Sequence, residues 1–229
     1  FAADRSCLPM RTRIKFCGLV RAEDVDTAVA LGVDAVGFVF YPKSPRALDA
    51  AQARALRNRL PSFVRSVGLF VNAPIAEIVR TVDEAGLDVV QLHGDETPDM
   101  INGVISAVAR PVWRAIRIRS RDDLLSSAAC SGGAECLLLD SYSDGFGGSG
   151  KTFDWSWIPP GYPARLILSG GLDEHRVGQA IAQVRPFAVD VSSGIQGASP
   201  RQKDPRRMEA FVAEVLRADA LLAAQSGNA

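Results

Sequence analysis

A lone acidic residue and a glycine-rich segment stand next to each other within residues 135–155, and they suggest two different chemistries. The apolar run ECLLLD ends on Asp140, and SYSDGFGGSGKTFDW follows it directly. From Gly145 to Thr152 the letters fit G-x-x-x-x-G-K-T, the pattern of a nucleotide-binding P-loop. Either this segment cradles nucleotide phosphates, or Asp140 is a catalytic carboxyl group and the glycines form a mobile cover.

The context of the glycine-rich segment argues against a P-loop. A working P-loop follows its strand directly and opens a long helix at its Lys-Thr pair. Here residues 141–144 separate the apolar run from the glycines, and the following FDWSWIPPGYP contains three prolines that interrupt a helix. We therefore favour a catalytic role for Asp140. Lys151 either touches the substrate or supports the loop at 147–151.

Two short motifs are typical of phosphate binding. Ser-Gly-Gly at 169–171 and Ser-Ser-Gly at 192–194 each follow a short apolar run. Backbone N–H groups in such turns of small residues can converge on a phosphate, helped by the N-terminus of a short helix. The predicted phosphate-binding residues are Gly170, Gly171, Ser192, Ser193 and Gly194.

Cys17 is the candidate base that would work with Asp140. It is the last residue of an apolar run, directly before Gly18, and Lys15 stands two positions earlier. A nearby cation lowers the pKa of a thiol and so favours the reactive thiolate. A thiolate and a carboxylic acid at the mouth of one fold can form an acid–base pair.

Three further polar residues are candidates for substrate binding. Arg46 follows the stiff segment YPKSP, and a restrained guanidinium suits bidentate binding of a carboxylate, although a solvated loop arginine is the alternative. His93, in QLHGD, is a ligand, an acid or a residue of the rim. Asp190 lies in the run 188–191 that leads into the second small-residue turn.

Eight short apolar runs rich in β-branched residues would place all these groups at strand ends. The predicted strands span 13–17, 35–39, 66–71, 89–92, 112–116, 136–140, 165–168 and 188–191. Amphipathic, helix-like segments alternate with them and begin near Ala22, Asp49, Pro74, Thr97, Ser120, Asp173 and Asp204, with a weak one after the sixth strand. Nearly continuous apolar strands are typical of a parallel sheet that helices cover.

Eight strand–helix units predict an α/β protein that is a single-domain (β/α)8 barrel. The alternative is an open doubly wound sheet, which places a glycine fingerprint after its first strand, where this chain has only Cys17-Gly18-Leu19. In a barrel, catalytic groups gather at the carboxyl ends of the strands. We expect the catalytic barrel to span 13–217, with a disordered lead or vector-derived remnant at 1–12. Residues 218–229 would end the last helix and fray after Asp219.

The composition of the chain limits the kinds of molecule that it is expected to bind. The chain has 229 residues, 47% of them hydrophobic, and its 26 basic and 26 acidic residues give a net charge of zero. This balance offers no electrostatic footprint for nucleic acid or an anionic membrane, and no apolar run reaches the roughly 18 residues of a membrane span. The four cysteines form no C-x-x-C pair, which argues against a disulfide framework or a zinc site. We expect a cytoplasmic protein, either monomer or homodimer, with a small-molecule substrate.

Seven motifs, in order, resemble those of the phosphoribosylanthranilate isomerase family of tryptophan biosynthesis. The resemblance extends from about Arg13 to Val215. The motifs are KFCGL, DAVGFVFYPKSPR, VGLFVN, VVQLHGDE, LLLDS with GGSGKTFDW, LSGGL with VDVSSGI, and KDP.

The resemblance implies roles for these residues. Cys17 would be the general base, Asp140 the general acid, and Arg46 the ligand of an anthranilate carboxylate, while His93 and Asp190 line the site. The implied reaction is the Amadori rearrangement of N-(5-phospho-β-D-ribosyl)anthranilate to 1-(2-carboxyphenylamino)-1-deoxy-D-ribulose 5-phosphate. The substrate is a phosphosugar, and no metal or redox cofactor is needed. The roles require a raised pKa for Asp140 and a Cys17 thiol that loses its proton easily.

Some residues depart from the family pattern, and other classes stay open. Phe16 replaces a common isoleucine, Gln196 a usual glutamate, and residues 198–202 a shorter link. The related histidine-pathway isomerase has an aspartate at the first strand end and a second phosphate loop near mid-chain, where this chain has Cys17 and Asn72. A P-loop nucleotide switch and a catalytically inactive barrel that only binds are the remaining alternatives.

Overall fold

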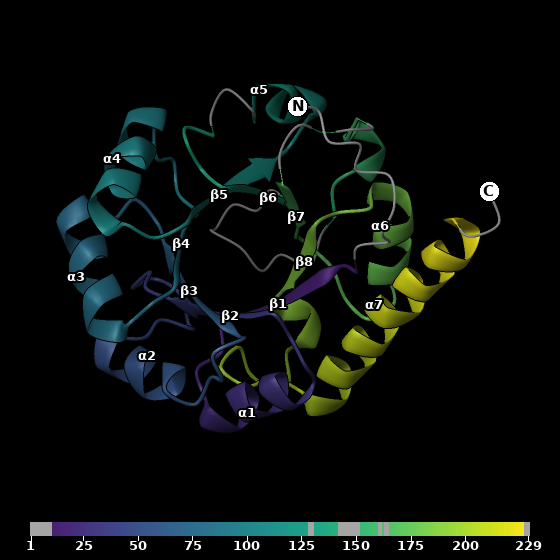
Figure 1. Ribbon diagram of the computed structural model, residues 1–229, viewed down its shortest axis with the longest axis horizontal. Coiled ribbons are helices and arrows are strands. Elements are labelled where there is room, and N and C mark those ends of the chain that lie inside the picture. Colours follow the sequence, from purple (N-terminus) through teal and green to yellow (C-terminus); the bar gives the residue numbers. More distant parts are fainter. Residues whose placement is uncertain (1–10, 128–130, 142–151, 160–161, 163–164, 227–229) are drawn as a thin grey trace.

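Eight parallel strands close into a barrel in the computed structural model, which describes residues 11–127, 131–141, 152–159, 162 and 165–226 (Figure 1). Neighbouring strands pair in sequence order, and the first pairs with the eighth to complete the ring. The fold is a (β/α)8 barrel, which confirms the predicted class. The strands are β1 (Arg13–Cys17), β2 (Ala35–Val39), β3 (Arg65–Phe70), β4 (Val89–Leu92), β5 (Val112–Ile118), β6 (Cys136–Ser141), β7 (Arg165–Leu168) and β8 (Ala188–Val191).

Helices surround the barrel, as Figure 1 shows. Between β6 and β7 the described residues contain only a short 3₁₀ helix, in agreement with the weak helical pattern there. The helices are α1 (Ala22–Ala30), α2 (Ala50–Arg57), α3 (Ile75–Ala85), α4 (Pro98–Val108), α5 (Arg121–Ser127), α6 (Val177–Val184) and α7 (Pro205–Ser226), with 3₁₀ helices η1 (Trp155–Trp157) and η2 (Ser193–Ile195).

Local signals explain where several helices begin and end. The Asp49 carboxylate accepts the Gln52 N–H at 2.7 Å while the Gln52 side chain accepts the Asp49 N–H at 3.0 Å, so a capping box opens α2. Thr97 caps α4, with proline at its first position. Gly86 closes α3 with a left-handed φ of 70°. These caps set the helix lengths between successive strands.

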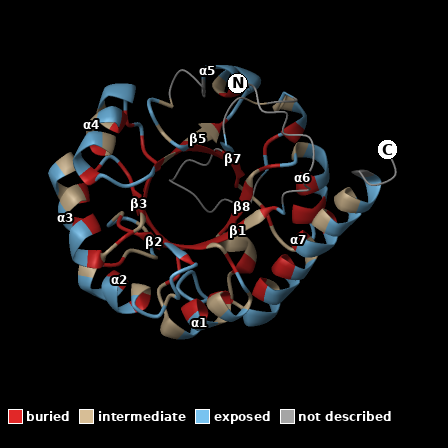
Figure 2. Cartoon of the chain, viewed as in Figure 1, coloured by how far each residue is buried: buried red, intermediate tan, exposed pale blue. Residues whose placement is uncertain are grey.

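Side-chain alternation along the strands separates an outer core from the barrel interior. Residues on the outward faces of the strands pack against the helices in one large buried cluster, and most of the ring of strands is buried (Figure 2). Inside the barrel, Cys17, Val39, Leu69 and Val71 form a cluster of their own. Because alternate residues face the same side, Lys15 shares the interior with Cys17.

The C-terminal helix extends beyond its predicted end. The expectation that the chain frays after Asp219 is wrong, since α7 continues to Ser226. The Asp219 carboxylate accepts hydrogen bonds from the backbone N–H and the hydroxyl of Thr12, both at 2.7 Å, and so joins the helix to the start of β1. Of the predicted lead, residues 1–10 lie outside the described residues. Among the helices that are described, none is long and apolar enough to cross a membrane.

Candidate active site

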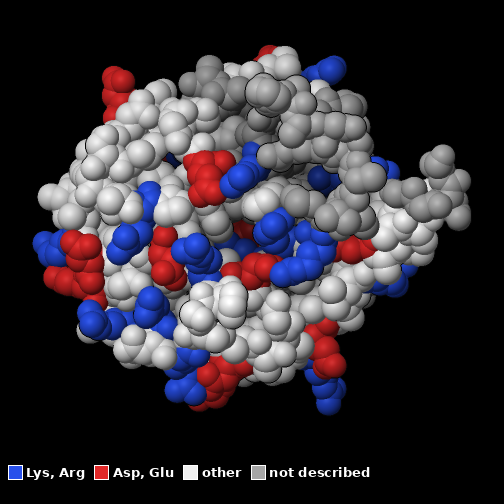
Figure 3. All heavy atoms as spheres, viewed as in Figure 1, with Lys and Arg blue, Asp and Glu red and all other residues white. Residues whose placement is uncertain are grey.

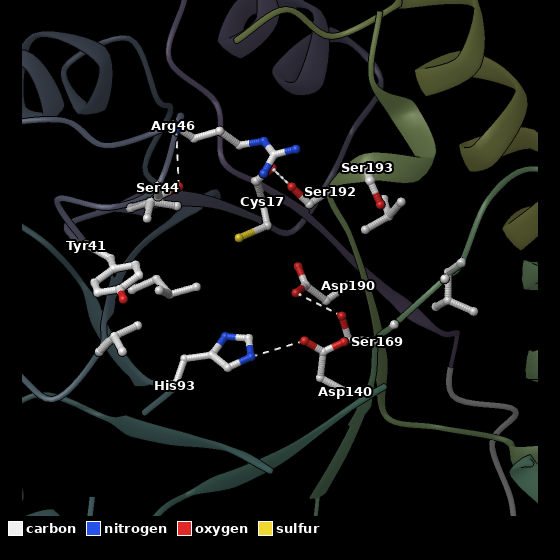
Figure 4. A pocket seen from close by; sticks show the side chains of 17 residues that line it. Cys17, Tyr41, Ser44, Arg46, His93, Asp140, Ser169, Asp190, Ser192 and Ser193 are labelled. Atoms are coloured by element: carbon white, nitrogen blue, oxygen red, sulfur yellow. Dashed lines mark hydrogen bonds and ion pairs between the residues drawn. The ribbon is translucent and has the colours of Figure 1, made fainter. Parts of the chain in front are cut away.

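A pocket at the carboxyl ends of the strands brings together almost all the predicted site residues (Figure 4). Cys17 comes from β1 and Asp140 from β6, and the two lie on different sides of the pocket. The strands therefore supply the two candidate proton-transfer groups from separate elements, as expected at the catalytic end of such a barrel. The predicted residues that line the pocket are Cys17, Arg46, His93, Asp140, Gly170, Gly171, Asp190, Ser192 and Ser193.

A buried ion pair lies beside Cys17. The register of β1 against β8 sets Lys15 opposite Asp190, and the Lys15 Nζ donates to Asp190 Oδ1 at 2.8 Å. Burial opposes the charge on Lys15, but Asp190 and Cys17 together outweigh it and raise the pKa of Lys15. Gly37 lies alongside, since a Cβ there would lie 2.9 Å from the Cys17 sulfur.

The Cys17 thiol is harder to ionise than expected. Burial raises the pKa of Cys17 above its ordinary value, and Asp190 raises it further, while Lys15 and Lys203 lower it in part. The free protein therefore holds Cys17 as a thiol, and Lys15 is the nearest group that favours the thiolate.

His93 lies next to Asp140 and is hydrogen-bonded on both ring nitrogens. Its Nε2 lies 3.1 Å from Asp140 Oδ2, and its Nδ1 lies 3.2 Å from the Gln91 amide nitrogen. Both His93 and Asp140 are 6% exposed. His93 is therefore held against the candidate acid, and its role in the reaction stays a prediction.

The turn after β7 requires glycine. Gly170 and Gly171 have φ angles of 84° and 65°, in the left-handed region that glycine adopts without strain. A Cβ on Gly170 would collide with the backbone nitrogen of Ser141 and lie 2.8 Å from Asp140 Oδ1. The turn can therefore approach β6 closely and bring its backbone to the pocket beside the candidate acid.

Gly194 is the one predicted phosphate-binding residue that does not line the pocket. A Cβ at this position would collide with the carbonyl oxygen of Leu172. Close packing between the turns after β7 and β8 therefore explains this glycine, and its role as a phosphate ligand stays a prediction.

A buried lysine that the sequence interpretation did not select supports the turn after β8. Lys203 is 1% exposed, and its Nζ donates to the Ser192 carbonyl at 2.8 Å. The Ser192 hydroxyl in turn donates to the Cys17 carbonyl at 3.0 Å. Burial, and next the charge of Arg46, lower the pKa of Lys203 to about 8. The Lys203 side chain thus lies behind the predicted phosphate-binding turn.

Replacing Lys203 with methionine should remove a gain in stability at alkaline pH. The unfolded lysine titrates near its model value of 10.5 and the folded one near 8, so between these values the unfolded state binds more protons. Stability therefore rises with pH across this window, by roughly 3 kcal/mol at about 1.4 kcal/mol per pKa unit. Urea unfolding of both proteins from pH 7 to 10.5 measures the difference. Parallel stability profiles in the two proteins would contradict this assignment.

Arg46 is held in place by the loop that follows β8. Its Nε donates to the Pro200 carbonyl at 3.0 Å, and one terminal nitrogen donates to the Gln196 side-chain oxygen at 2.7 Å. Burial lowers the pKa of Arg46, with the Cys17 thiolate form as an opposing influence. Because both partners are neutral, the guanidinium charge stays available to an anion in the pocket.

The opposite wall of the pocket is apolar, and the sequence interpretation did not identify it. Tyr41, Val39, Leu69 and Val71 line this side. The last three occupy alternate positions at the ends of β2 and β3, so the same strand-end rule that selected Cys17 applies to them. Because these residues carry no charge, no motif marks them in the sequence.

Some strand-end residues have other partners. Arg117 forms an ion pair with Asp95, and the Asn72 side chain accepts the Asp95 N–H at 2.7 Å, so these three form the rim near β4 and β5 rather than the pocket.

Acidic and basic side chains are interleaved around the hollow in the middle of the face that Figure 3 draws.

The described residues do not provide the helix that a P-loop requires. The segment 147–151, with Lys151, lies outside the described residues. After Thr152 the described chain forms only η1 before β7, so the long helix that a P-loop needs is not found there.

Comparisons with known proteins agree on one family. The family model described as "PRAI: N-(5'phosphoribosyl)anthranilate (PRA) isomerase" matches residues 14–214. The N-(5'-phosphoribosyl)anthranilate isomerase of Methylibium petroleiphilum is 51% identical over 215 residues, covering 94% of this chain and 99% of the relative.

Two solved structures share both fold and sequence with this chain, and each comparison covers 90% of this chain and 99% of the other. One shows monomers of a dimeric phosphoribosylanthranilate isomerase from Thermotoga maritima, at 37% identity and a TM-score of 0.80. The other, at 36% identity and a TM-score of 0.80, is a phosphoribosylanthranilate isomerase in complex with reduced 1-(o-carboxyphenylamino)-1-deoxyribulose 5-phosphate. Together with the matched motifs and the strand-end pocket, these findings show that the chain belongs to the N-(5'-phosphoribosyl)anthranilate isomerase family.

Proposed function

We propose that the chain catalyses the Amadori rearrangement of N-(5-phosphoribosyl)anthranilate to 1-(2-carboxyphenylamino)-1-deoxyribulose 5-phosphate, in tryptophan biosynthesis. The observation that carries the proposal is one pocket that holds a thiol and a carboxyl group from different strands, Cys17 and Asp140. A general acid and a general base on separate sides of a substrate are what an aldose–ketose isomerisation requires.

The two ends of the pocket suit the two ends of this substrate. Gly170, Gly171, Ser192 and Ser193 offer a turn-rich edge for a phosphate, with the buried ammonium of Lys203 behind it. The apolar wall of Val39, Tyr41, Leu69 and Val71 suits an aromatic ring. We assign the carboxylate of the anthranilate to Arg46, whose guanidinium has only neutral partners in this structure.

The reaction then proceeds by proton transfers alone. Asp140 protonates the ribose ring oxygen, the C1–O bond breaks, and the nitrogen lone pair forms the C=N bond of a Schiff base. The thiolate form of Cys17, which burial opposes and Lys15 favours, removes the C2 proton to give an enolamine. Loss of the C2 hydroxyl proton to Asp140 and protonation of C1 by the Cys17 thiol complete the ketone and return both groups to their starting forms, so substrate and product contain the same atoms.

Turnover of the proposed substrate is the direct test. Phosphoribosylanthranilate should lose its anthranilate-type fluorescence in the presence of the purified protein at a rate proportional to enzyme concentration. A barrel that only binds would quench or retain the fluorescence stoichiometrically, without turnover, and that result would reject the proposal.

We further propose that the chain forms a homodimer through the amino-terminal end of its barrel. Phe63, in the loop between α2 and β3, is 94% exposed. It borders a hollow whose lining includes Trp113, Phe187 and Ile167. Charged residues such as Arg13, Asp34, Arg65 and Glu135 also line the hollow. A large apolar side chain beside the apolar part of this hollow suits reciprocal insertion between two copies about a two-fold axis. The dimeric relative from Thermotoga maritima supports the same state.

Phe63→Asp should convert the dimer to a monomer and leave turnover intact. Each dimer would lose two buried phenylalanines at about 1.5–3 kcal/mol apiece, which weakens association at least about a hundredfold. Analytical ultracentrifugation over a concentration series measures this shift. Leu216→Asp, at a residue 55% exposed on α7, is the matched control and should leave association unchanged. A wild-type protein that is monomeric throughout would reject the dimer.

A further inference from the structure

A chain of three buried side chains connects the centre of the barrel to the candidate acid. Gln91 and His93 are two residues apart at the end of β4, so both side chains face the barrel interior. The Gln91 amide nitrogen lies 3.2 Å from His93 Nδ1, and His93 Nε2 lies 3.1 Å from Asp140 Oδ2. Gln91 is fully buried. Figure 4 shows the His93 ring turned towards Asp140.

The amide determines which nitrogen of His93 carries the proton. An amide nitrogen only donates hydrogen bonds, so Nδ1 must accept from Gln91 and must carry a lone pair. An imidazolium ring has no lone pair, and its charged form is therefore incompatible with this contact. With the amide in this orientation, the contact favours the neutral tautomer of His93 with its proton on Nε2, whose N–H would donate to Asp140.

The opposite orientation of the Gln91 amide is less favourable. As placed, the amide gives one N–H to His93 and leaves its oxygen Oε1 and its second N–H without a hydrogen-bond partner among the described residues. Rotating the amide by 180° would direct the oxygen to His93 and leave both N–H groups of the amide nitrogen in the dry interior. Buried N–H groups without partners are rarer than under-satisfied carbonyl oxygens, so the orientation in which Gln91 donates is preferred.

Backbone contacts on both sides of His93 keep the ring in this position. The His93 N–H donates to the Phe70 carbonyl at 2.9 Å. The next residue, Gly94, donates its N–H to the Glu96 carboxylate at 2.9 Å and accepts from Arg114 at 3.2 Å. Glu96 and Arg114 are themselves a buried ion pair. The turn after β4 is thus rigidly held, and the tautomer of His93 is the remaining variable.

The two oxygens of Asp140 consequently have different roles. Oδ2 accepts from His93, which leaves Oδ1 as the oxygen that can hold a proton for transfer. Oδ1 is the oxygen near Gly170, where a Cβ would approach to within 2.8 Å. After proton transfer, the His93 N–H stabilises the carboxylate that remains.

We propose that Gln91 is a positioning residue that holds His93 as the neutral Nε2–H tautomer and so directs proton donation to Oδ1 of Asp140. The proposal rests on the proposed isomerase function and deepens it. Gln91 does not line the pocket, and its effect on the reaction passes through His93.

Nitrogen NMR of 15N-histidine-labelled protein near pH 7.5 tests the tautomer without any substrate. The chain has two histidines, and His175, with a side chain 83% exposed, serves as the internal reference. We expect a protonated Nε2 and an unprotonated Nδ1 for His93. In Gln91→Glu the new carboxylate accepts from the ring, so Nδ1 should become protonated. A wild-type ring protonated on Nδ1, or an unchanged ring in Gln91→Glu, would overturn the proposal.

Kinetics separate positioning from simple structural damage. Gln91→Glu and Gln91→Met should lower kcat by about tenfold to a hundredfold, the range typical of losing a group that orients a functional histidine, while KM changes little. Gln91→Met preserves the side-chain length if the buried charge prevents Gln91→Glu from folding. Leu138→Met, another interior substitution on β6, should keep full activity. Unchanged kcat in a folded Gln91→Met protein would contradict the role.

Failure of the proposed function gives a different pattern. A wild-type protein with the expected tautomer and no turnover of phosphoribosylanthranilate would reject the isomerase assignment and, with it, the role in proton donation. Full turnover with the opposite tautomer would reject only the role of Gln91.

Discussion

Asp140→Asn should reduce turnover by about 100-fold to 10,000-fold while the protein stays folded and binds substrate. The asparagine side chain has the same shape and can still accept the His93 N–H that now reaches Oδ2 at 3.1 Å. It has no acidic proton for the ribose ring oxygen, so ring opening loses its catalyst. The loss should therefore appear in kcat, measured by the fluorescence decay of phosphoribosylanthranilate, with KM nearly unchanged.

Asp26→Asn is the matched control for this substitution. Asp26 forms an ion pair with Arg59 on the surface, where its side chain is 48% exposed. The substitution is the same as at Asp140 but lies outside the pocket. Its turnover should equal that of the wild type. Normal kcat in Asp140→Asn itself would exclude Asp140 as the acid and require another proton donor in the pocket.

The fold was predictable from the sequence because its strands are short, apolar and separated by clear helix signals. β1, β2, β4, β7 and β8 have the predicted bounds, while β3 lies one residue earlier and β5 and β6 run longer. The added residues are Arg117 and Ile118 in β5 and Ser141 in β6, and a hydrophobic pattern stops at the polar Arg117 and at the polar Ser141. Pairing between β5 and β6 extends to these residues in the barrel.

The start of a helix was harder to predict where a capping residue closes a separate turn before the helix begins. Asp173 predicted the start of a helix, but α6 begins at Val177. The Asp173 carboxylate accepts the N–H groups of His175 and Arg176, both at 3.0 Å, and so first closes a separate turn. A capping residue marks a change in direction of the chain, and the sequence alone does not say how many residues lie between the cap and the helix.

Site residues that stand at strand ends could be predicted from the sequence. Residues that support a turn of the pocket without lining it could not. Cys17, His93, Asp140 and Asp190 each stand at or next to a strand end, and chemistry at that end is a property of the fold. Lys203 reaches back to Ser192 from the far end of the segment that joins β8 to α7. Contacts of this kind depend on how loops fold back, which no local pattern encodes.

The pKa of Cys17 was the expectation that the structure changed most. A lysine two residues away suggested an easily ionised thiol, because the cation favours the thiolate. The same cation is shared with Asp190, and burial dominates, so the pKa of Cys17 is raised. Proximity in sequence identified the right partner, but the balance of burial and two opposite charges sets the direction.

Cys17→Ala should abolish turnover as completely as Asp140→Asn, by about 100-fold to 10,000-fold, because no base then takes the C2 proton. Cys136→Ala is the matched control, since Cys136 is also buried and lies in the barrel interior outside the pocket. Burial raises the pKa of Cys136 to about 12, so this thiol has no thiolate to offer. Turnover that survives in Cys17→Ala would exclude the cysteine as the base.

The raised pKa predicts how Cys17 should react in the free protein. Since only the thiolate is alkylated, modification of Cys17 by iodoacetamide should be slow at neutral pH and should still be accelerating at pH 9, the ordinary value for a thiol. Lys15→Met should slow it further at each pH, because Asp190 then acts on the thiol without the cation that favours its ionised form. Site-resolved mass spectrometry of the alkylated peptide measures both rates. Faster alkylation in Lys15→Met would show that Lys15 suppresses the thiolate, and the base would need a different activating group.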